Sequence, residues 1–402
     1  MPWPAGLRAF RHRDFRLFWS GQLVSLVGTW MQSVGQAWIV LELTGSPFKL
    51  GVISALQFGP MLFLSLVAGA LADRVRKRRL LLLTQGALML QALALAALDW
   101  TGQIQFWHVA VLAAVYGVAN TLDLPARQSF VVELVGKGDL MNAIALNATV
   151  FNGARVVGPA VAGLLIARYG VAPAFLVNGL SFLGVLVALS AIRTEGAPRP
   201  RAVATLGQEI LQGVRYAAGT PLIGLILSLL LVVSLFVLNF NVLVPLVARD
   251  VLHEGARGFG LLMASLGLGA VAGALALAAM SRTRPPLALI VTAALVTSAG
   301  VLGLAAVRHF WIAAAALAVM GFTQIVFMAS CNTTVQTTAP DHLRGRVMSL
   351  YALVFVGAHP FGALLMGGVA EKWGVGAACF WGGGMGLCLV LALALLWRRR
   401  GV

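Results

Sequence analysis

Three residues inside long apolar segments could bind a proton or an anion: Asp123, Arg155 and His359. A carboxylate or an imidazole within a membrane span can take up and release a proton, and a guanidinium there needs a counter-charge or an anionic ligand. We expect proton exchange at Asp123 first, and we consider His359 and the span-end carboxylates Glu42 and Asp99 as further candidates. For Arg155 the alternative is a structural ion pair, with Asp123 as the nearest partner, and for His359 it is packing.

A stripe of polar side chains follows the first apolar segment at spacings of three and four residues, which places its members on one face of a helix. The stripe comprises Gln22, Ser25, Thr29, Gln32 and Gln36. Lipid cannot satisfy five polar groups, so this face should contact water, a ligand or polar neighbours. Lining of a substrate cavity is one interpretation and hydrogen bonding between helices is the other. Further candidates for the cavity are Asn120, Asn239, Asn241, Gln324 and Asn332.

The composition requires a lipid environment around these side chains. Of the 402 residues, 60% are hydrophobic and only 10% are charged, whereas soluble domains carry about 25% charged residues. The net charge of +16 does not indicate nucleic-acid binding, because the basic residues lie at the ends of apolar runs and form no single stripe. The chain is therefore predicted to be an all-α polytopic membrane protein.

Twelve apolar segments are long enough to cross a bilayer, since about 20 helical residues span its hydrocarbon core. Most of the 29 Lys and Arg residues fall at one set of segment ends, which predicts cytoplasmic N and C termini under the positive-inside rule. The segments lie at 17–41, 50–72, 80–98, 106–124, 141–167, 172–192, 222–247, 259–281, 286–307, 310–332, 347–370 and 376–397.

The polar stretch 193–220 divides the spans into two six-helix bundles, predicted at 1–192 and 221–402, with 193–220 as a cytoplasmic linker. Shifting the sequence by 204 residues pairs Gly158 with Gly362 and Tyr169-Gly170-Val171 with Trp373-Gly374-Val375. Chance alignment of glycines is the alternative. Two pseudo-symmetric halves are typical of transporters whose site lies between repeats.

The loop between the second and third spans reads Gly-Ala-Leu-Ala-Asp-Arg-Val-Arg-Lys-Arg-Arg over residues 69–79. Gly69 would let the second span approach a neighbour closely, and Asp73 could face a helix N-terminus. The loop resembles the signature of the major facilitator superfamily, except that Arg76 replaces the usual glycine. The resemblance covers the whole chain and implies a gating loop of Gly69, Asp73 and Arg74 that latches against the start of the eleventh span. Anchoring of topology is the alternative for the arginines.

The fifth span is rich in small residues, which permit close helix packing, and its proline removes one backbone hydrogen bond. The pattern resembles the antiporter signature of the same superfamily, with alanine at three glycine positions, and implies export; ordinary packing is the alternative. Arg155 lies within the pattern, whose other members are Ala145, Ala154, Gly158, Pro159, Ala162 and Gly163.

Four further stretches, at 13–19, 28–31, 43–47 and 340–347, resemble the drug:proton antiporter branch that includes the bacterial enterobactin exporter and macrolide efflux proteins. This resemblance implies a monomeric transporter in the bacterial cytoplasmic membrane that exports small amphipathic organic molecules, drug- or siderophore-like, by proton-coupled alternating access. Its partners would be the lipid bilayer, the substrate and protons. The alternatives are a lysophospholipid or lipid-like substrate, an uncoupled uniporter of the same fold, and, from another class, a membrane-embedded enzyme or receptor.

The sequence contains no phosphate-binding loop and no clustered metal-ligand motif. We therefore expect no cofactor and no enzymatic activity.

Overall fold

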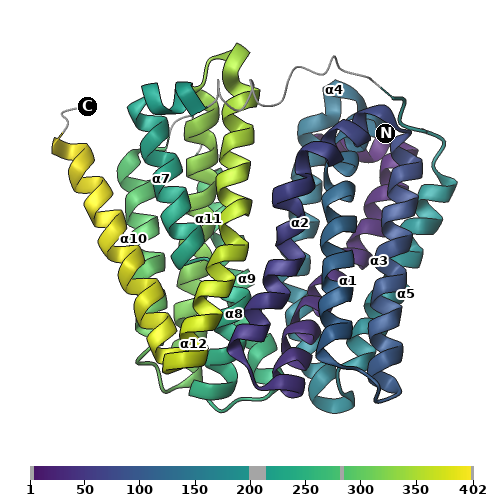
Figure 1. The fold of residues 1–402 in the computed structure, drawn as a ribbon. Coiled ribbons are helices and arrows are strands. Elements are labelled where there is room, and N and C mark those ends of the chain that lie inside the picture. The colour runs from purple at the N-terminus through teal and green to yellow at the C-terminus, as the bar shows by residue number, and fades with distance from the viewer. Residues whose placement is uncertain (1–3, 199–213, 281–284, 400–402) are drawn as a thin grey trace. The chain divides into compact units, whose positions relative to one another are not determined.

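Apolar runs separated by short polar turns fold into long helices, because a helix satisfies its own backbone hydrogen bonds in lipid. The computed structural model describes residues 4–198, 214–280 and 285–399 (Figure 1). It divides into two compact units, the first formed by Met1–Gly45 with Gly59–Arg201 and the second by Ser46–Phe58 with Ala202–Val402. The predicted linker lies partly outside the described residues, from 199 to 213.

In the first unit, α1 packs against α4 and α5, and α3 packs against the same two helices. The long helix α4 holds two spans that meet at Gly136, whose φ of 68° breaks the helical path and favours glycine. The aromatic rings of Phe18 and Phe130 contact each other in the apolar core of this unit. The elements are η1 (Ala5–Arg11), α1 (Arg13–Thr44), α3 (Lys77–Trp100), α4 (Phe106–Tyr169) and α5 (Ala172–Ala191).

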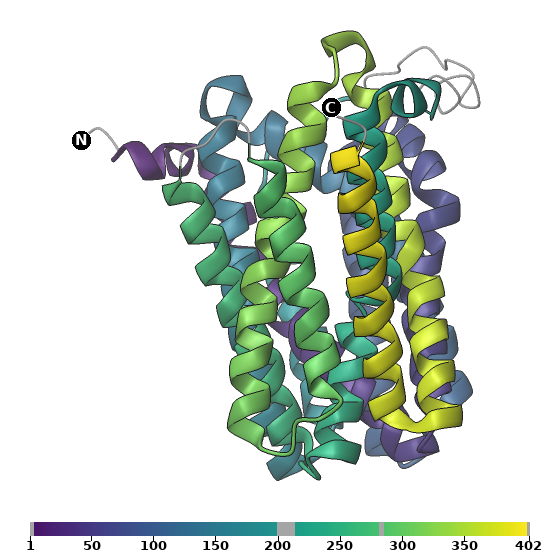
Figure 2. The same ribbon diagram turned by 90° about the vertical axis from the view of Figure 1, so that its left-hand side faces the viewer.

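In the second unit, α11 packs against α9 and α10, and α12 packs against α7 and α10. Helix α12 also holds two spans, which meet at Gly374 with a φ of 85° and run side by side in opposite directions (Figure 2). The elements are α7 (Pro221–Phe236), α8 (Phe240–Leu246), the π-helix η2 (Val247–Val251), α9 (Ala256–Ala279), α10 (Leu287–Leu304), α11 (Phe310–Thr338) and α12 (Asp341–Arg399).

The number of spans agrees with the predicted twelve. Among the described residues, nine stretches are long and apolar enough to cross a membrane, and two of them, α4 and α12, each contain two spans. Helix α1, which carries the polar stripe, adds the remaining one. The predicted all-α class is confirmed.

Helix α2 (Pro47–Arg74) is divided between the two units at Gly59. Its next residue, Pro60, lacks the N–H that would continue the helical hydrogen bonds. Before this point α2 packs on α12: the Ser46 hydroxyl donates to Glu371 at 2.8 Å and the Phe48 amide donates to it at 3.2 Å. The first unit therefore lacks residues 46–58 of the predicted first bundle, 1–192, and extends beyond it to Arg201.

The two halves repeat two local features that the shift of 204 residues pairs. Gly170 has φ 81° and ψ −175°, and Gly374 has φ 85° and ψ 165°, so both turns between neighbouring spans use the same backbone conformation. A Cβ atom at Gly158 would meet Trp30 and Val27 of α1, and one at Gly362 would meet Leu235 and Asn239 beside α7. In each half the paired glycine thus lies against that half's first span, which supports duplication.

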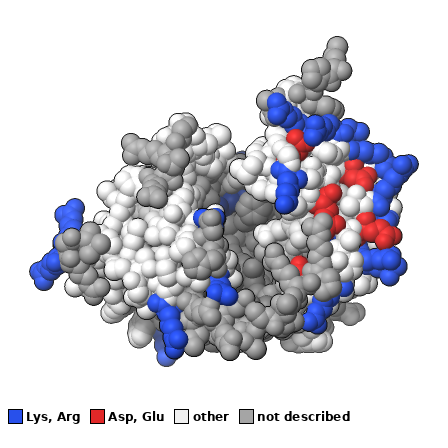
Figure 3. Space-filling view, turned by 90° about the horizontal axis from the view of Figure 1, so that it is seen from above, with Lys and Arg blue, Asp and Glu red and all other residues white. Residues whose placement is uncertain are grey.

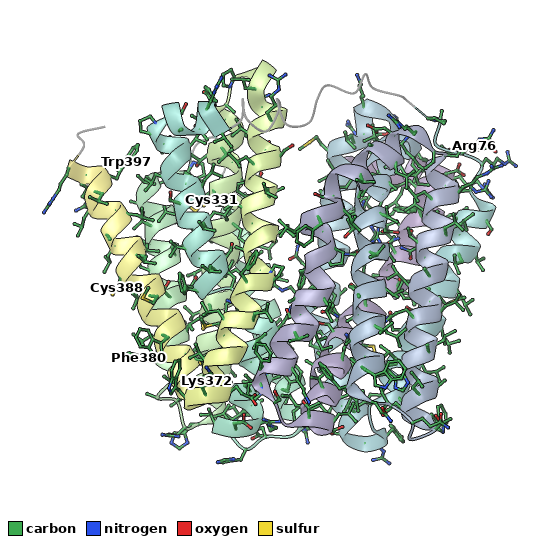
Figure 4. All side chains as sticks on the ribbon, in the orientation of Figure 1. Arg76, Cys331, Lys372, Phe380, Cys388 and Trp397 are labelled. Carbon is green, nitrogen blue, oxygen red and sulfur yellow. The ribbon has the colours of Figure 1, made fainter. Side chains whose placement is uncertain are left out.

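Charged side chains hold together the end of the first unit at which α1 begins. The Lys77 ammonium contacts Glu133 at 2.9 Å and donates to the carbonyl of Ala197 at 2.9 Å, while Arg76 pairs with Glu195 at 2.8 Å. Seen from this end, acidic side chains lie among the basic ones (Figure 3), and Arg76 marks the same end in Figure 4. The basic loop therefore fixes the segment that follows α5.

Candidate functional site

Asp123 and Arg127 form a buried ion pair on the first segment of α4. The carboxylate of Asp123 has no solvent exposure, and Arg127, one helical turn further, donates to its Oδ2 from Nε at 2.7 Å and from a second guanidinium nitrogen. The remaining guanidinium nitrogen donates to Gln22 Oε1 of α1 at 2.8 Å. Burying two charges is expensive unless each is paired and hydrogen-bonded, and here the pair also links α4 to α1.

Helix α3 completes the hydrogen bonding of this carboxylate. The Thr84 hydroxyl lies 2.8 Å from Asp123 Oδ1, and Gln85 Nε2 donates to the same oxygen at 2.7 Å. Oδ1 therefore faces two neutral groups of α3, whereas Oδ2 faces the guanidinium of Arg127. We call Gln22, Thr84, Gln85, Asp123 and Arg127 the Asp123 cluster.

The ion pair with Asp123, which is the structural alternative for Arg155, is not the arrangement in the structure. Asp123 binds Arg127, and the guanidinium carbon of Arg155 lies 5.8 Å from the ring centre of Trp30. Arg127 is a second basic residue within α4 besides Arg155, and it lies nine residues before the break at Gly136. The positive-inside rule places Arg127 among the basic residues at the cytoplasmic ends of the spans. The spacing of four residues between Asp123 and Arg127 was the signal that could have revealed the pair.

The polar stripe of α1 points into the first unit. Gln32 donates to Gln91 of α3 at 2.9 Å and accepts from Asn178 of α5 at 2.6 Å. Gln22, Ser25 and Gln36 are also buried, and Thr29 donates to the Ser25 carbonyl at 2.9 Å. For Gln22 and Gln32 these contacts support hydrogen bonding between helices, while a role of the stripe in a substrate cavity stays a prediction.

The other cavity candidates are spread over both units. Asn120 lies on α4; Asn239 lies at the break between α7 and α8, where its amide donates to the Leu235 carbonyl at 2.8 Å. Asn241 is the second residue of α8, which begins at Phe240. On α11, the Gln324 amide lies 3.9 Å from the Met328 sulfur, and Asn332 accepts from Gln336 at 2.6 Å. Their predicted role in one cavity stays a prediction.

His359 lies in an aromatic cluster of the second unit. Its Nδ1 lies 3.0 Å from the Phe355 carbonyl oxygen, and its ring centre lies 5.2 Å from that of Phe355 and 5.6 Å from that of Phe58. These contacts support packing as the interpretation. In the described part of the chain, no three His, Cys, Asp or Glu side chains are grouped to hold a metal ion.

The residues of the predicted gating loop lie in the last turns of α2, in the first unit. A Cβ atom at Gly69 would meet no heavy atom within 4 Å, and the close approach expected at this glycine stays a prediction. Asp73 and Arg74 end α2, whereas the start of the eleventh span, the predicted contact, belongs to α12 of the second unit, which begins at Asp341. The latch stays a prediction.

The small residues of the fifth span lie against α1. A Cβ at Gly158 would come within 2.5 Å of the Trp30 Cβ and 2.9 Å of the Val27 carbonyl oxygen, so only glycine fits without a shift. Pro159 and Gly163 are buried beside it. The geometry accounts for these residues by packing, and the antiporter role stays a prediction.

Comparisons with known proteins agree with this architecture. The model of the transmembrane secretion effector family matches residues 5–401. The multidrug efflux pump Tap of Mycolicibacterium fortuitum is 29% identical over 364 residues, covering 88% of each chain. The enterobactin exporter EntS of Salmonella typhi is 29% identical over 396 residues, covering 97% of this chain and 94% of its own.

Among solved structures, a POT family transporter in complex with a thioalcohol-conjugated peptide aligns with a TM-score of 0.78 at 11% identity, covering 96% of each chain. This likeness concerns the fold. The family match extends over nearly the whole sequence. The chain is thus a multi-pass integral membrane protein of the transmembrane secretion effector family, a transporter of the major facilitator superfamily and not an enzyme.

Proposed function

We propose that the protein exports small amphipathic organic molecules, drug- or siderophore-like, in exchange for protons across a bacterial cytoplasmic membrane, with both termini in the cytoplasm. The names of its relatives, a multidrug efflux pump and an enterobactin exporter, support the substrate class and the direction. The small-residue pattern around Gly158 and Pro159 in the fifth span is consistent with export. The protein would act as a monomer.

The observation that carries proton coupling is the buried Asp123 cluster. Among the described residues, Asp123 is the carboxylate farthest from the ends of its span, and it is completely shielded from solvent. Protonation removes its charge and so weakens its hold on Arg127, because charge-assisted hydrogen bonds are about twice as strong as neutral ones. Arg127 also binds Gln22 of α1, so the proton alters a contact between two spans.

The contact that holds one state closed and the site that takes up the proton would then be different residues, Asp73 and Asp123. Asp73, at the end of α2, would hold one state closed against the start of α12, as the superfamily resemblance implies. Asp123 would bias the equilibrium between states through its proton. A difference of one pH unit supplies 1.36 kcal/mol per proton, so one-for-one exchange supports about a tenfold gradient of an uncharged substrate.

The test is transport by the purified protein in proteoliposomes with an imposed pH gradient. The probes are the fluorescent cation ethidium, an iron-free catecholate siderophore and a fluorescent lysophospholipid. We expect gradient-driven movement of ethidium or the siderophore by the wild type and its loss in Asp123→Asn. Glu371→Gln is the matched control, because it removes another helix carboxylate, which accepts from the Ser46 hydroxyl at 2.8 Å outside the Asp123 cluster and is not a candidate for proton exchange.

Each outcome assigns the function. Movement that ignores the pH gradient contradicts proton exchange and leaves an uncoupled uniporter. Movement of the lysophospholipid alone replaces the proposed substrate class by a lipid-like one. If Asp123→Asn still couples transport to the pH gradient and His359→Gln does not, the proton site is His359 in the aromatic cluster of the second unit.

A further inference from the structure

Gln85 occupies an unusual position in the Asp123 cluster. Its side chain is 1% exposed, and its Nε2 donates to Asp123 Oδ1 at 2.7 Å. The other end of the same amide, Oε1, is buried and has no hydrogen-bond partner among the described residues. A buried carbonyl oxygen without a donor destabilises the folded state, because it has lost its hydrogen bond to water, so packing alone does not explain a glutamine here.

Thr84 has a matching property. Its hydroxyl lies 2.8 Å from Asp123 Oδ1 and 3.2 Å from the Leu81 carbonyl oxygen. A hydroxyl carries one hydrogen, so it donates to one of these two oxygens at a time, and it can also accept. Both groups that face Oδ1 can therefore either donate or accept: Thr84 by rotating its hydroxyl, and Gln85 by turning its amide through 180°.

The other carboxylate oxygen has no such choice. Oδ2 is bound by Arg127, whose guanidinium donates and never accepts. A proton on Oδ2 would face these N–H groups, whereas a proton on Oδ1 would find two oxygens able to receive it. The charged and titratable groups around Asp123 are Arg127 and Tyr116, both on α4; α1 contributes Gln22, and α3 contributes Thr84 and Gln85.

We infer that Asp123 takes its proton on Oδ1, and that Thr84 and Gln85 of α3 are positioning residues that change from donors to acceptors when it does so. This inference rests on the proposed proton coupling. It assigns to the third span the task of keeping both protonation states of a buried carboxyl hydrogen-bonded. Gln85 turns with little net loss, because one end of its amide is bonded in either orientation.

The size of the effect follows from the difference between two hydrogen bonds. The bond from Gln85 to the ionised carboxylate is charge-assisted, and the bond that it accepts from the neutral acid is not. A hydrogen bond to a charged group contributes more than one between neutral groups. Replacing Gln85 by Met therefore weakens the ionised state more, and since 1.36 kcal/mol corresponds to one pH unit, the protonation midpoint should rise by about one unit.

The experiment measures protonation directly by infrared titration of the full-length protein in proteoliposomes, using the carboxylic-acid carbonyl band that Asp123→Asn removes. For Gln85→Met we expect the pH midpoint of this band to rise by about one unit, which is a tenfold gain in proton affinity. The midpoint should also rise for Thr84→Val. It should stay unchanged for Thr84→Ser, which keeps the hydroxyl. The pH profile of transport should move with it.

Gln91→Met is the matched control. Gln91 is another buried glutamine of α3 that has one bonded and one unbonded amide end, but its partner is the uncharged Gln32. Its loss should lower stability without moving the Asp123 midpoint. An unmoved midpoint in both Gln85→Met and Thr84→Val overturns the inference, as does equal movement in Gln91→Met.

The same titration separates this inference from the proposed function. An Asp123 band that responds to Gln85, in a protein whose transport ignores the pH gradient, overturns the coupling and leaves the roles of Thr84 and Gln85 intact. Transport that responds normally to the pH gradient, with an Asp123 midpoint that Gln85→Met and Thr84→Val leave unchanged, supports the coupling and overturns the roles of Thr84 and Gln85. If no Asp123-dependent band titrates between about pH 4 and 9, a range that covers ordinary and raised carboxyl values, both fail.

Discussion

The fourth span and its counterpart in the other half carry different chemistry at matching positions. Helices α4 and α11 both begin with a Phe-Trp pair, at 106 and 310, and the shift of 204 residues aligns Asp123 with Phe327 and Arg127 with Cys331. Phe327 and Cys331 are completely buried, and Figure 4 shows Cys331 among the helices of its unit. One half thus fills with apolar groups a place that the other fills with an ion pair.

This difference distinguishes the residues that the helix bundle requires from the ion pair that only the first half carries. A buried ion pair rarely stabilises a protein more than apolar residues of similar volume. At the aligned positions the second half is built with the buried Phe327 and Cys331. An ion pair is therefore not a general requirement of such a helix bundle, which is a second argument for a functional role of Asp123 and Arg127.

The largest effect should come from breaking the pair on one side. Arg127→Met leaves Asp123 buried without its counter-charge, which should lower the free energy of unfolding by about 3–5 kcal/mol. The double variant Asp123→Phe with Arg127→Cys copies the second half and should recover most of that loss, but not gradient-driven transport. Thermal unfolding in detergent and proteoliposome transport measure the two properties. A double variant that still couples to the gradient would contradict the functional role of the pair.

A smaller effect tests the packing that both halves share. Alanine at Gly158 places a Cβ 2.5 Å from the Trp30 Cβ, and alanine at Gly362 places one 2.5 Å from the Leu235 carbonyl oxygen. Such overpacking should cost about 1–3 kcal/mol in each half. Gly153→Ala is the control, because a Cβ there meets nothing within 4 Å. Unequal thermal stabilities of the two variants would show that the repeated contact differs in importance.

The repeated turns provide a third comparison. Gly170 and Gly374 both combine a positive φ with a ψ near 180°, a region essentially limited to glycine, which another residue adopts at a cost of about 1–3 kcal/mol. Gly170→Ala and Gly374→Ala should therefore lower the unfolding temperature by similar amounts, although neither Cβ would touch a neighbour. A loss in one half only would contradict a common turn.

The smallest effect concerns a contact of the N-terminal segment. The hydrogen bond from His12 and the charge of Arg11 hold the pKa of Asp139 below its ordinary value. A lowered carboxyl pKa stabilises the folded state above the unfolded value of about 3.9, and this contribution disappears as the pH falls through the folded value. Amide exchange of residues 5–11, corrected for intrinsic rates, should rise in acid. Asp139→Asn should show the rise already at neutral pH; equal protection in both proteins at neutral pH would contradict the contact.

The spans were predictable because each is a long apolar run bounded by charges or glycines. The shift of 204 residues identified Gly170 and Gly374, because a repeated turn leaves a repeated glycine. Arg127 was missed because positive charges near span ends usually anchor topology, and α4 continues to Val135, beyond the predicted end at 124. Thr84 and Gln85 could not be found from spacing, because their partner lies 39 and 38 residues away on another helix.

The docking of residues 46–58 on α12 has a consequence for the order of folding. The hydrogen bond between Ser46 and Glu371 joins residues 325 positions apart, so this half of α2 meets its final partner only when nearly the whole chain exists. At synthesis rates of about 5–20 residues per second, that interval is roughly 15–65 s. During this interval residues 59–74 can pack with the first unit, because α2 is divided between the units at Gly59 and Pro60. Residues 47–58 then remain in the bilayer without their final partner. The second half of this transporter therefore completes its own fold with a piece of the first.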